Sequence, residues 1–202
     1  MKKNIVIADD HPVFLIGLRT VVNSSFGEKF TISGEAQTVD QLLRILLTQK
    51  PDVLLTDFNM PGMQQTDGLR LISIIRRKYP DLPIVVITVM TNPALVKSIL
   101  STGVFAVINK QALTTELTAC LNALLLGRRS PGAIYEEPHT ESMSPRELEV
   151  IRLLAQGYTV NQIATMLHRT KQTISAQKKN AMRKIGANTD IELFEYLRVS
   201  GL

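Results

Sequence analysis

Five short apolar runs, rich in valine, isoleucine and leucine, recur between residues 5 and 108 of the chain. Each run is followed by a longer stretch with the apolar spacing of an amphipathic helix. The runs contain few polar residues, which is typical of strands that helices cover on both faces of a parallel sheet. Strands are predicted at residues 5–8, 30–34, 53–56, 84–89 and 106–108, and helices at 13–22, 39–47, 69–77, 94–100 and 113–126. This alternation predicts an α/β domain with a doubly wound, five-stranded parallel sheet.

Acidic residues stand at the ends of two of these runs. Asp57 ends the run LLTD, and Asp9 and Asp10 end the run NIVIADD. If the two strands are parallel neighbours, the three carboxylates meet in the crevice beyond the carboxyl ends of the sheet, where open α/β sheets bind ligands. Three close carboxylates repel one another unless a cation joins them, and their hard oxygen atoms suit Mg²⁺. The sequence therefore predicts a magnesium site at this edge of the sheet.

Thr88 and Lys110 complete the set, because each stands at the end of a further apolar run. Taken singly, each acid could be a turn former or helix cap, and Lys110 could be a solvated cation. Ordinary surface residues have no reason to gather at the same ends of alternating strands, which favours a shared site. An aspartate close to Mg²⁺, a hydroxyl and an ammonium group is equipped to accept a phosphoryl group covalently. We therefore predict that Asp57 is a phosphoacceptor.

This pattern resembles the receiver domain of two-component response regulators, over roughly residues 2–126. The resemblance implies a flavodoxin-like fold with strand order 2-1-3-4-5. The roles that it implies are Mg²⁺ ligation for Asp9, Asp10, Asp57 and the Asn59 backbone carbonyl, a switch hydroxyl for Thr88 and a phosphate partner for Lys110.

Two residues depart from the receiver pattern. Val107 stands where many receivers carry an aromatic switch residue, and Gln111 stands where a proline commonly follows the lysine. The resemblance therefore does not extend to the aromatic rotamer switch, although the metal and acceptor groups are complete. His11 follows the acidic pair and could touch the metal site, but we interpret it as the start of the first helix.

The composition changes after Leu126. The segment GRRSPGAIYEEPHTES, residues 127–142, is rich in glycine, proline, serine and charge, as is typical of an interdomain linker. A chain of 202 residues is long enough for two small domains. We predict a receiver domain at residues 1–126, a linker at 127–142 and a second domain at 143–202.

Explicit helix starts and stops mark the second domain. A Ser-Pro-x-Glu motif at residues 144–147 predicts an N-cap, a proline in the first turn and a capping-box glutamate. A Thr-x-x-Gln motif at residues 159–162 starts a second helix, and Thr170 starts a third that ends near Gly186. Two helices joined by a short turn favour a helix-turn-helix.

The third helix has two chemically different sides. Its core side is predicted to carry Ile174, Ala181 and Ile185, and its outer side Lys171, Ser175, Lys179 and Arg183. Residues 169–184 hold six lysines and arginines and no acid, so the basic charge is local. Such a face is often only solvated, but after two capped helices it favours entry into the DNA major groove.

The segment from Ser144 to Gly186 resembles a LuxR-type helix-turn-helix, and the whole chain resembles the NarL/FixJ class of response regulators. The resemblance implies an all-α domain of four helices. Its base-reading positions correspond to Lys171, Ser175, Ala176 and Lys179, and its phosphate contacts to Lys178 and Lys184.

The function that these features predict is DNA-binding transcription regulation, controlled by Mg²⁺-dependent phosphorylation of Asp57. The expected partners are double-stranded DNA, a histidine kinase or phosphotransfer protein as phosphoryl donor, and a second copy of the chain or an auxiliary regulator in a dimer. An aspartate-nucleophile phosphatase is disfavoured, because Asn59 stands where its general acid belongs and no cap segment exists, so we expect no enzyme. A pseudo-receiver that dimerises without phosphate remains the alternative.

The compartment follows from what the sequence lacks. No apolar run reaches about 18 residues and no charged-then-apolar leader precedes the first strand, so we expect a cytoplasmic protein with no membrane partner. Cys120 is the single cysteine, and its place among leucines predicts an inert, buried thiol.

Overall fold

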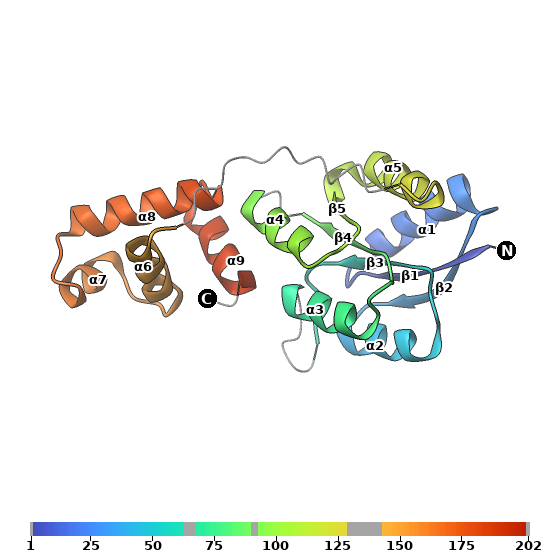
Figure 1. Cartoon of the computed structure of the whole chain (residues 1–202), viewed down its shortest axis with the longest axis horizontal. Helices are drawn as coiled ribbons and strands as arrows, with labels where there is room; N and C mark the ends of the chain where they lie inside the picture. The colour runs from blue at the N-terminus through green and yellow to red at the C-terminus, as the bar shows by residue number, and fades with distance from the viewer. Residues whose placement is uncertain (1, 63–67, 90–92, 129–142, 201–202) are drawn as a thin grey trace. The chain divides into compact units, whose positions relative to one another are not determined.

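The computed structural model describes residues 2–62, 68–89, 93–128 and 143–200, which form two compact units (Figure 1). The strands are β1 (Lys3–Ala8), β2 (Phe30–Ala36), β3 (Val53–Asp57), β4 (Ile84–Thr88) and β5 (Ala106–Asn109). The helices up to residue 125 are α1 (Pro12–Phe26), α2 (Val39–Thr48), α3 (Gly68–Lys78), α4 (Pro93–Ser101), the short 3-10 helix η1 (Lys110–Ala112) and α5 (Leu113–Leu125).

All strands of the sheet run parallel in the order β2-β1-β3-β4-β5, which confirms the predicted fold class. In the register of the sheet, Ala8 lies opposite Thr56, and Thr88 lies opposite Asn109. Parallel strands in register end at the same edge, so the residues that end β1, β3, β4 and β5 face one crevice.

Helices cover both faces of this sheet, which explains the nearly continuous apolar runs. On one face, Ile5 and Ile7 of β1 pack with Leu18 of α1 and Leu117 of α5, all at most 1% exposed. Figure 1 shows α1 and α5 together on that side and α2 and α3 across the sheet. Burying each such side chain stabilises the fold by roughly 1.5–3 kcal/mol, so both faces resist polar substitution.

Three elements extend two or more residues past one end of their predicted ranges, and the first of them, β1, begins at Lys3 rather than at residue 5. Helix α1 continues to Phe26, whose buried side chain joins the core, and the hydroxyls of Thr20 and Ser24 donate hydrogen bonds to carbonyls one turn back, at 2.8 and 2.7 Å. Strand β2 continues to Ala36, which pairs with Ala8 at the end of β1. The extensions of α1 and β2 thus include polar residues.

The second unit includes α6 (Pro145–Ala155), α7 (Val160–Met166), α8 (Lys171–Ile185) and α9 (Asp190–Ser200). The predicted capping box at residues 144–147 is present, and the Thr-x-x-Gln motif at residues 159–162 forms a second one. Thr170 accepts a hydrogen bond from the backbone of Thr173 at the start of α8, and Gly186 ends α8 with a left-handed φ of 72°. The short turn between α7 and α8 makes the predicted helix-turn-helix.

The core of this unit confirms the predicted inner side of α8. Ile174 and Ala181 are fully buried and Ile185 is 3% exposed, and α8 packs against α6 and α7 in a cluster that also includes Leu193 and Leu197 of α9. Most of the predicted linker, residues 129–142, lies outside the described residues, so the proposed domain boundaries stay a prediction. Within the described parts of the chain, no helix is long and apolar enough to cross a membrane.

Candidate phosphoacceptor site and nucleic-acid interface

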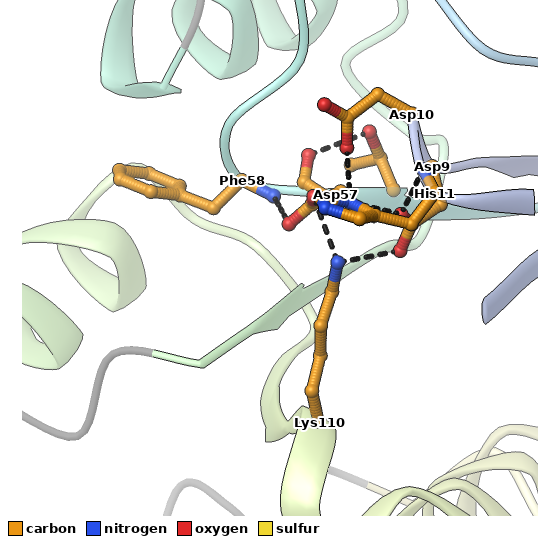
Figure 2. Close-up of polar contacts among 7 residues, drawn as sticks. Asp9, Asp10, His11, Asp57, Phe58 and Lys110 are labelled. Carbon is orange, nitrogen blue, oxygen red and sulfur yellow. Dashed lines mark hydrogen bonds and ion pairs between the residues drawn. The ribbon is translucent and has the colours of Figure 1, made fainter. Parts of the chain in front are cut away.

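The three predicted acids come together at the carboxyl edge of the sheet (Figure 2). Asp57 is the last residue of β3, and Asp9 and Asp10 directly follow β1, the strand beside it. One side-chain ligand atom from each, and one from His11, all lie within 4.8 Å of one another. Asp9 is fully buried and Asp57 is 6% exposed, so both carboxylates are shielded from water.

Lys110 reaches this cluster from two strands away. It follows β5, which is separated from β3 by β4, and its Nζ lies 2.9 Å from Asp57 Oδ2 and 2.7 Å from Asp9 Oδ2. The backbone of Lys110, the first residue of η1, is held by a local cap, in which the Asn109 side chain accepts a hydrogen bond from the Gln111 backbone at 2.9 Å. A proline at position 111 would lack that N–H, which gives the departure at Gln111 a structural reason.

The acidic side chains of the site carry more negative charge than the Lys110 ammonium can neutralise. Burial raises the pKa of Asp57, and the hydrogen bond from Lys110 only partly opposes this effect. Burial lowers the pKa of Lys110, but its bonds to Asp9 and Asp57 outweigh burial and raise that pKa overall. Three carboxylates against one ammonium leave a net negative charge when all are ionised. The oxygen donors of Asp9, Asp10 and Asp57 therefore fit a hard divalent cation such as Mg²⁺.

Asp57 is also held by backbone. Its Oδ1 accepts a hydrogen bond from the Phe58 backbone N–H at 2.7 Å, while Oδ2 faces Lys110. The Phe58 ring is buried, and Gly68, the first residue of α3, donates its N–H to the Phe58 carbonyl at 3.0 Å. Gly68 has φ +57°, and an added Cβ would lie 3.3 Å from the Phe58 ring, so this position favours glycine.

The outer face of α8 carries the predicted base-reading residues. Lys171, Ser175, Ala176 and Lys179 are all exposed. The two predicted phosphate contacts are instead engaged within the unit. Lys178 Nζ lies 2.7 Å from Asp190 Oδ2 on α9, and Lys184 Nζ lies 2.9 Å from Glu147 Oε2 on α6.

The Glu147 pair also joins a helix cap. Its Oε2 accepts a hydrogen bond from the Ser144 backbone at 2.6 Å, and its side chain is 7% exposed. Lys184 and then the Ser144 backbone hold the pKa of Glu147 below its ordinary value. The cap of α6 and the last turn of α8 are therefore tied at one carboxylate.

Two family models match the sequence of this chain. The response regulator receiver domain matches residues 5–122, and the luxR family of bacterial regulatory proteins matches residues 141–197. The chain belongs to the response regulator family, with a LuxR-type DNA-binding domain. Both resemblances drawn from the sequence are thus confirmed.

Known regulators are similar to this chain over nearly its whole length. The transcriptional regulatory protein RcsB of Salmonella typhi is 38% identical to this response regulator over 96% of the chain and 93% of the relative. RcsB of Escherichia coli K12 is 37% identical over the same shares, and the response regulator UvrY of that organism is 26% identical over 94% of the chain and 91% of its own length.

Solved structures of RcsB are also similar to nearly the whole chain. A complex of RcsB with DNA has a TM-score of 0.87 at 37% identity, covering 98% of this chain and 99% of that one. RcsB from Salmonella enterica serovar Typhimurium bound to promoter rprA, with the phosphomimetic BeF3⁻, has a TM-score of 0.89 at 37% identity, covering 98% and 100%.

The switch positions of this response regulator are buried. Thr88 ends β4 and is 1% exposed, next to the strand that carries Asp57. Val107 lies opposite Val86 in the sheet and is 8% exposed, so an aliphatic side chain occupies the place of the aromatic switch. Asn59 is half-buried two residues beyond Asp57. The roles of Thr88 and Asn59 stay predictions.

His11 starts α1, as predicted, and also reaches the acids. Its backbone has the extended conformation of an N-cap, and its N–H donates to Asp9 Oδ1 at 2.9 Å. Its ring Nδ1 lies 2.6 Å from Asp10 Oδ1. His11 therefore starts α1 and also contacts two of the acids that are predicted to hold Mg²⁺.

Phe14 is the residue of the site that sequence reasoning missed. Its ring lies on the first turn of α1, and Lys110 Nζ stands 4.3 Å from the ring centroid. Nothing in the local pattern of α1 points to a lysine at the end of β5. Only the adjacency of α1 and η1 in the fold brings the two together.

Proposed function

We propose that Mg²⁺-supported phosphorylation of Asp57 controls DNA binding by this response regulator. The observation that carries the proposal is the position of Lys110, whose ammonium contacts both Asp57 and Asp9 inside a buried acid cluster. A buried lysine in a purely structural ion pair needs one carboxylate as its partner. Here three carboxylates, those of Asp9, Asp10 and Asp57, lie together at the ammonium. This arrangement suits a carboxylate that alternates between free and phosphorylated forms.

The chemistry uses residues already in contact. A carboxylate oxygen of Asp57 attacks the phosphorus of a phosphohistidine in a kinase or phosphotransfer protein. The O–P bond forms as the P–N bond breaks, and the imidazole leaves with a proton taken from water. Lys110 neutralises the phosphoryl oxygens at the end of its flexible stem. Mg²⁺ held by Asp9, Asp10, Asp57 and the Asn59 carbonyl would supply further positive charge at those oxygens.

The output proposed for this signal is a dimer on DNA. Solved relatives include two RcsB dimers bound to two parallel DNAs, with a TM-score of 0.90 at 37% identity. A homodimer, or a heterodimer with an auxiliary regulator, reads two half-sites about one helical turn apart and so doubles the sequence read. Because Val107 lacks an aromatic ring, we expect modest coupling of ~1–3 kcal/mol between phosphorylation and DNA affinity. Such a regulator acts on the chromosome, so we place it in the cytoplasm.

The base contacts are proposed for the exposed residues of α8. Lys171 and Lys179 can donate to base edges, and the short side chains of Ser175 and Ala176 allow a close approach. The relatives named as transcriptional regulators favour this reading over a phosphatase, and the comparisons do not favour a phosphate-independent pseudo-receiver.

Covalent labelling tests the acceptor. The full-length chain is incubated with Mg²⁺ and acetyl phosphate, and intact mass and peptide mapping locate the adduct. We expect one hydroxylamine-labile phosphoryl group on Asp57, none in Asp57→Asn, and a strongly reduced yield when Asp9 and Asp10 are both changed to asparagine. An adduct that persists in Asp57→Asn would refute the assignment.

A second experiment tests the output. Sedimentation and DNA binding are measured with and without a beryllofluoride mimic, on a duplex with two half-sites selected from a random pool. We expect a larger dimer fraction and tighter binding with the mimic. Identical mass and affinity in both conditions would exclude phosphate control and support the pseudo-receiver alternative.

A further inference from the structure

The ring of Phe14 covers the ammonium group of Lys110 from the side of α1. Lys110 Nζ lies 4.3 Å from the ring centroid, well within the range of about 6 Å in which a cation is attracted to an aromatic face. The lysine side chain is only 4% exposed, so little water competes for its charge. An attraction of this kind is strongest when the cation is desolvated.

The ring is itself held in place. Phe14 lies one turn beyond His11 on α1, and the two rings meet edge to face at 6.1 Å with an interplanar angle of 88°. The Nδ1 atom of His11 in turn lies 2.6 Å from Asp10 Oδ1. Phe14 therefore contacts two side chains that both reach the acid cluster, those of His11 and Lys110.

We propose that Phe14 is a positioning residue that keeps the Lys110 ammonium directed at Asp57 during phosphoryl transfer. The inference rests on the proposed function of Asp57. A lysine has a long flexible stem, and its carboxylate partners change when Asp57 gains a phosphoryl group. The ring offers a partner whose attraction is the same before and after transfer, so the ammonium stays in the crevice throughout.

Ordinary core packing would also bury part of Phe14, and the two roles predict different chemistry. Packing depends on the size of the side chain. A cation–π contact depends on the negative charge of the ring face, which each added fluorine withdraws with little change in volume. A series of fluorinated phenylalanines at one position separates the two roles.

The experiment places phenylalanine with one, two or three ring fluorines at position 14 of the full-length chain. The initial rate of Asp57 labelling by acetyl phosphate is measured at fixed Mg²⁺, beside the melting temperature of each protein. We expect the rate to fall stepwise, by about three- to tenfold over the series, at a nearly constant melting temperature. Phe14→Leu should lie at the bottom of the series and Phe14→Tyr close to the parent.

Phe105 provides the matched control, because it is half-buried like Phe14 and lies at the opposite end of β5 from Lys110. The same fluorinated series at position 105 should leave the labelling rate unchanged. A flat series at position 14, or equal slopes at both positions, overturns the positioning role while leaving Asp57 as acceptor. A parent chain that takes no label at all overturns the proposed function, and this inference with it.

Discussion

The acid cluster and the outer face of α8 hold lysines in opposite ways. Lys110 is buried, and its ammonium is fixed by two carboxylates and an aromatic ring. Lys171 and Lys179 stand exposed on a helix whose inner side alone is packed. A buried, fully engaged cation suits a reaction that needs one geometry, whereas exposed cations suit a long ligand that brings its own negative charge.

Between these extremes lie Lys178 and Lys184, which are partly covered and paired with acids of their own unit. Basic residues on one helix are therefore not interchangeable. Some are available to DNA, and others hold the helix that presents them. Substituting one lysine of each kind tests this difference.

The largest effect is expected from Lys110→Ala. The substitution leaves Asp9 and Asp57 without their shared cation and removes the positive charge from the phosphoryl oxygens. By analogy with the loss of one preorganised donor in an enzyme, we expect labelling of Asp57 by acetyl phosphate to slow by about 100-fold. The exposed Lys29, before β2, serves as the control, and Lys29→Ala should label at the parent rate. Equal rates in both variants would show that Lys110 is only structural.

Lys179→Ala should act on DNA alone. The side chain is exposed, so the melting temperature should stay within the error of the measurement. If Lys179 reads a base, affinity for the selected site falls by about 1–3 kcal/mol and the preference relaxes at one position. Fluorescence anisotropy on the site and on single-base variants measures both. An unchanged preference would move Lys179 from base reading to phosphate contact.

Lys184→Ala should act first on stability. It leaves the carboxylate of Glu147 buried without its cation, and we expect the free energy of unfolding to fall by about 1–2 kcal/mol. Urea unfolding measures the loss, and Glu147→Gln in the same background should recover part of it. If Lys184 also contacts a phosphate, as predicted, binding to all sequences weakens alike and the salt slope falls by about one unit. Unchanged stability together with a lower slope would assign Lys184 to DNA alone.

The same carboxylate gives a pH dependence. Because the folded pKa of Glu147 is depressed, its stabilising contribution is present above the unfolded pKa of about 4.3 and is lost as the pH falls through the folded pKa. We expect amide hydrogen exchange in α6 and α8, corrected for intrinsic rates, to speed up in acid. This increase in exchange rate should not exceed the increase that Lys184→Ala causes at neutral pH. In Glu147→Gln the local acid dependence should disappear, and its persistence would point to another group.

The sequence predicted the acid cluster well and the pairs of α8 poorly, for one physical reason. Strand ends are set by apolar runs, and parallel pairing brings those ends to one edge, so Asp9, Asp57 and Lys110 had to meet. Helical periodicity gives the direction of a side chain but not what another helix places there. The partners of Lys178 and Lys184 lie on α9 and α6, and no local pattern indicates them.

Helix α9 also has a start signal in its local sequence. Helix α9 starts with a Thr-x-x-Glu motif at residues 189–192, in which Thr189 accepts a hydrogen bond from the Glu192 backbone at 3.2 Å. The Glu192 side chain reaches back to the Asn188 backbone at 2.7 Å. The motif resembles those that marked α6 and α7, so this helix could have been placed from the sequence without any family resemblance.

The smallest effect is expected at Lys178, whose partner Asp190 has a side chain that is 59% exposed. An exposed pair contributes roughly 0.2–1 kcal/mol, so Lys178→Ala should barely change stability. Since Asp190 competes with DNA phosphates for this ammonium, the substitution should lower the salt slope by less than one unit in the parent.

Asp190→Asn frees Lys178, so in that background Lys178→Ala should lower the salt slope by a full unit. Glu149→Gln, an exposed change of equal charge on α6, controls for net charge and should leave the cost of Lys178→Ala as it is in the parent. A full unit lost in the parent as well would show that DNA takes Lys178 from Asp190 without difficulty. In that case a paired lysine is as available to DNA as the unpaired kind, and the contrast between the residues that read DNA and those that hold α8 would rest on Lys184 alone.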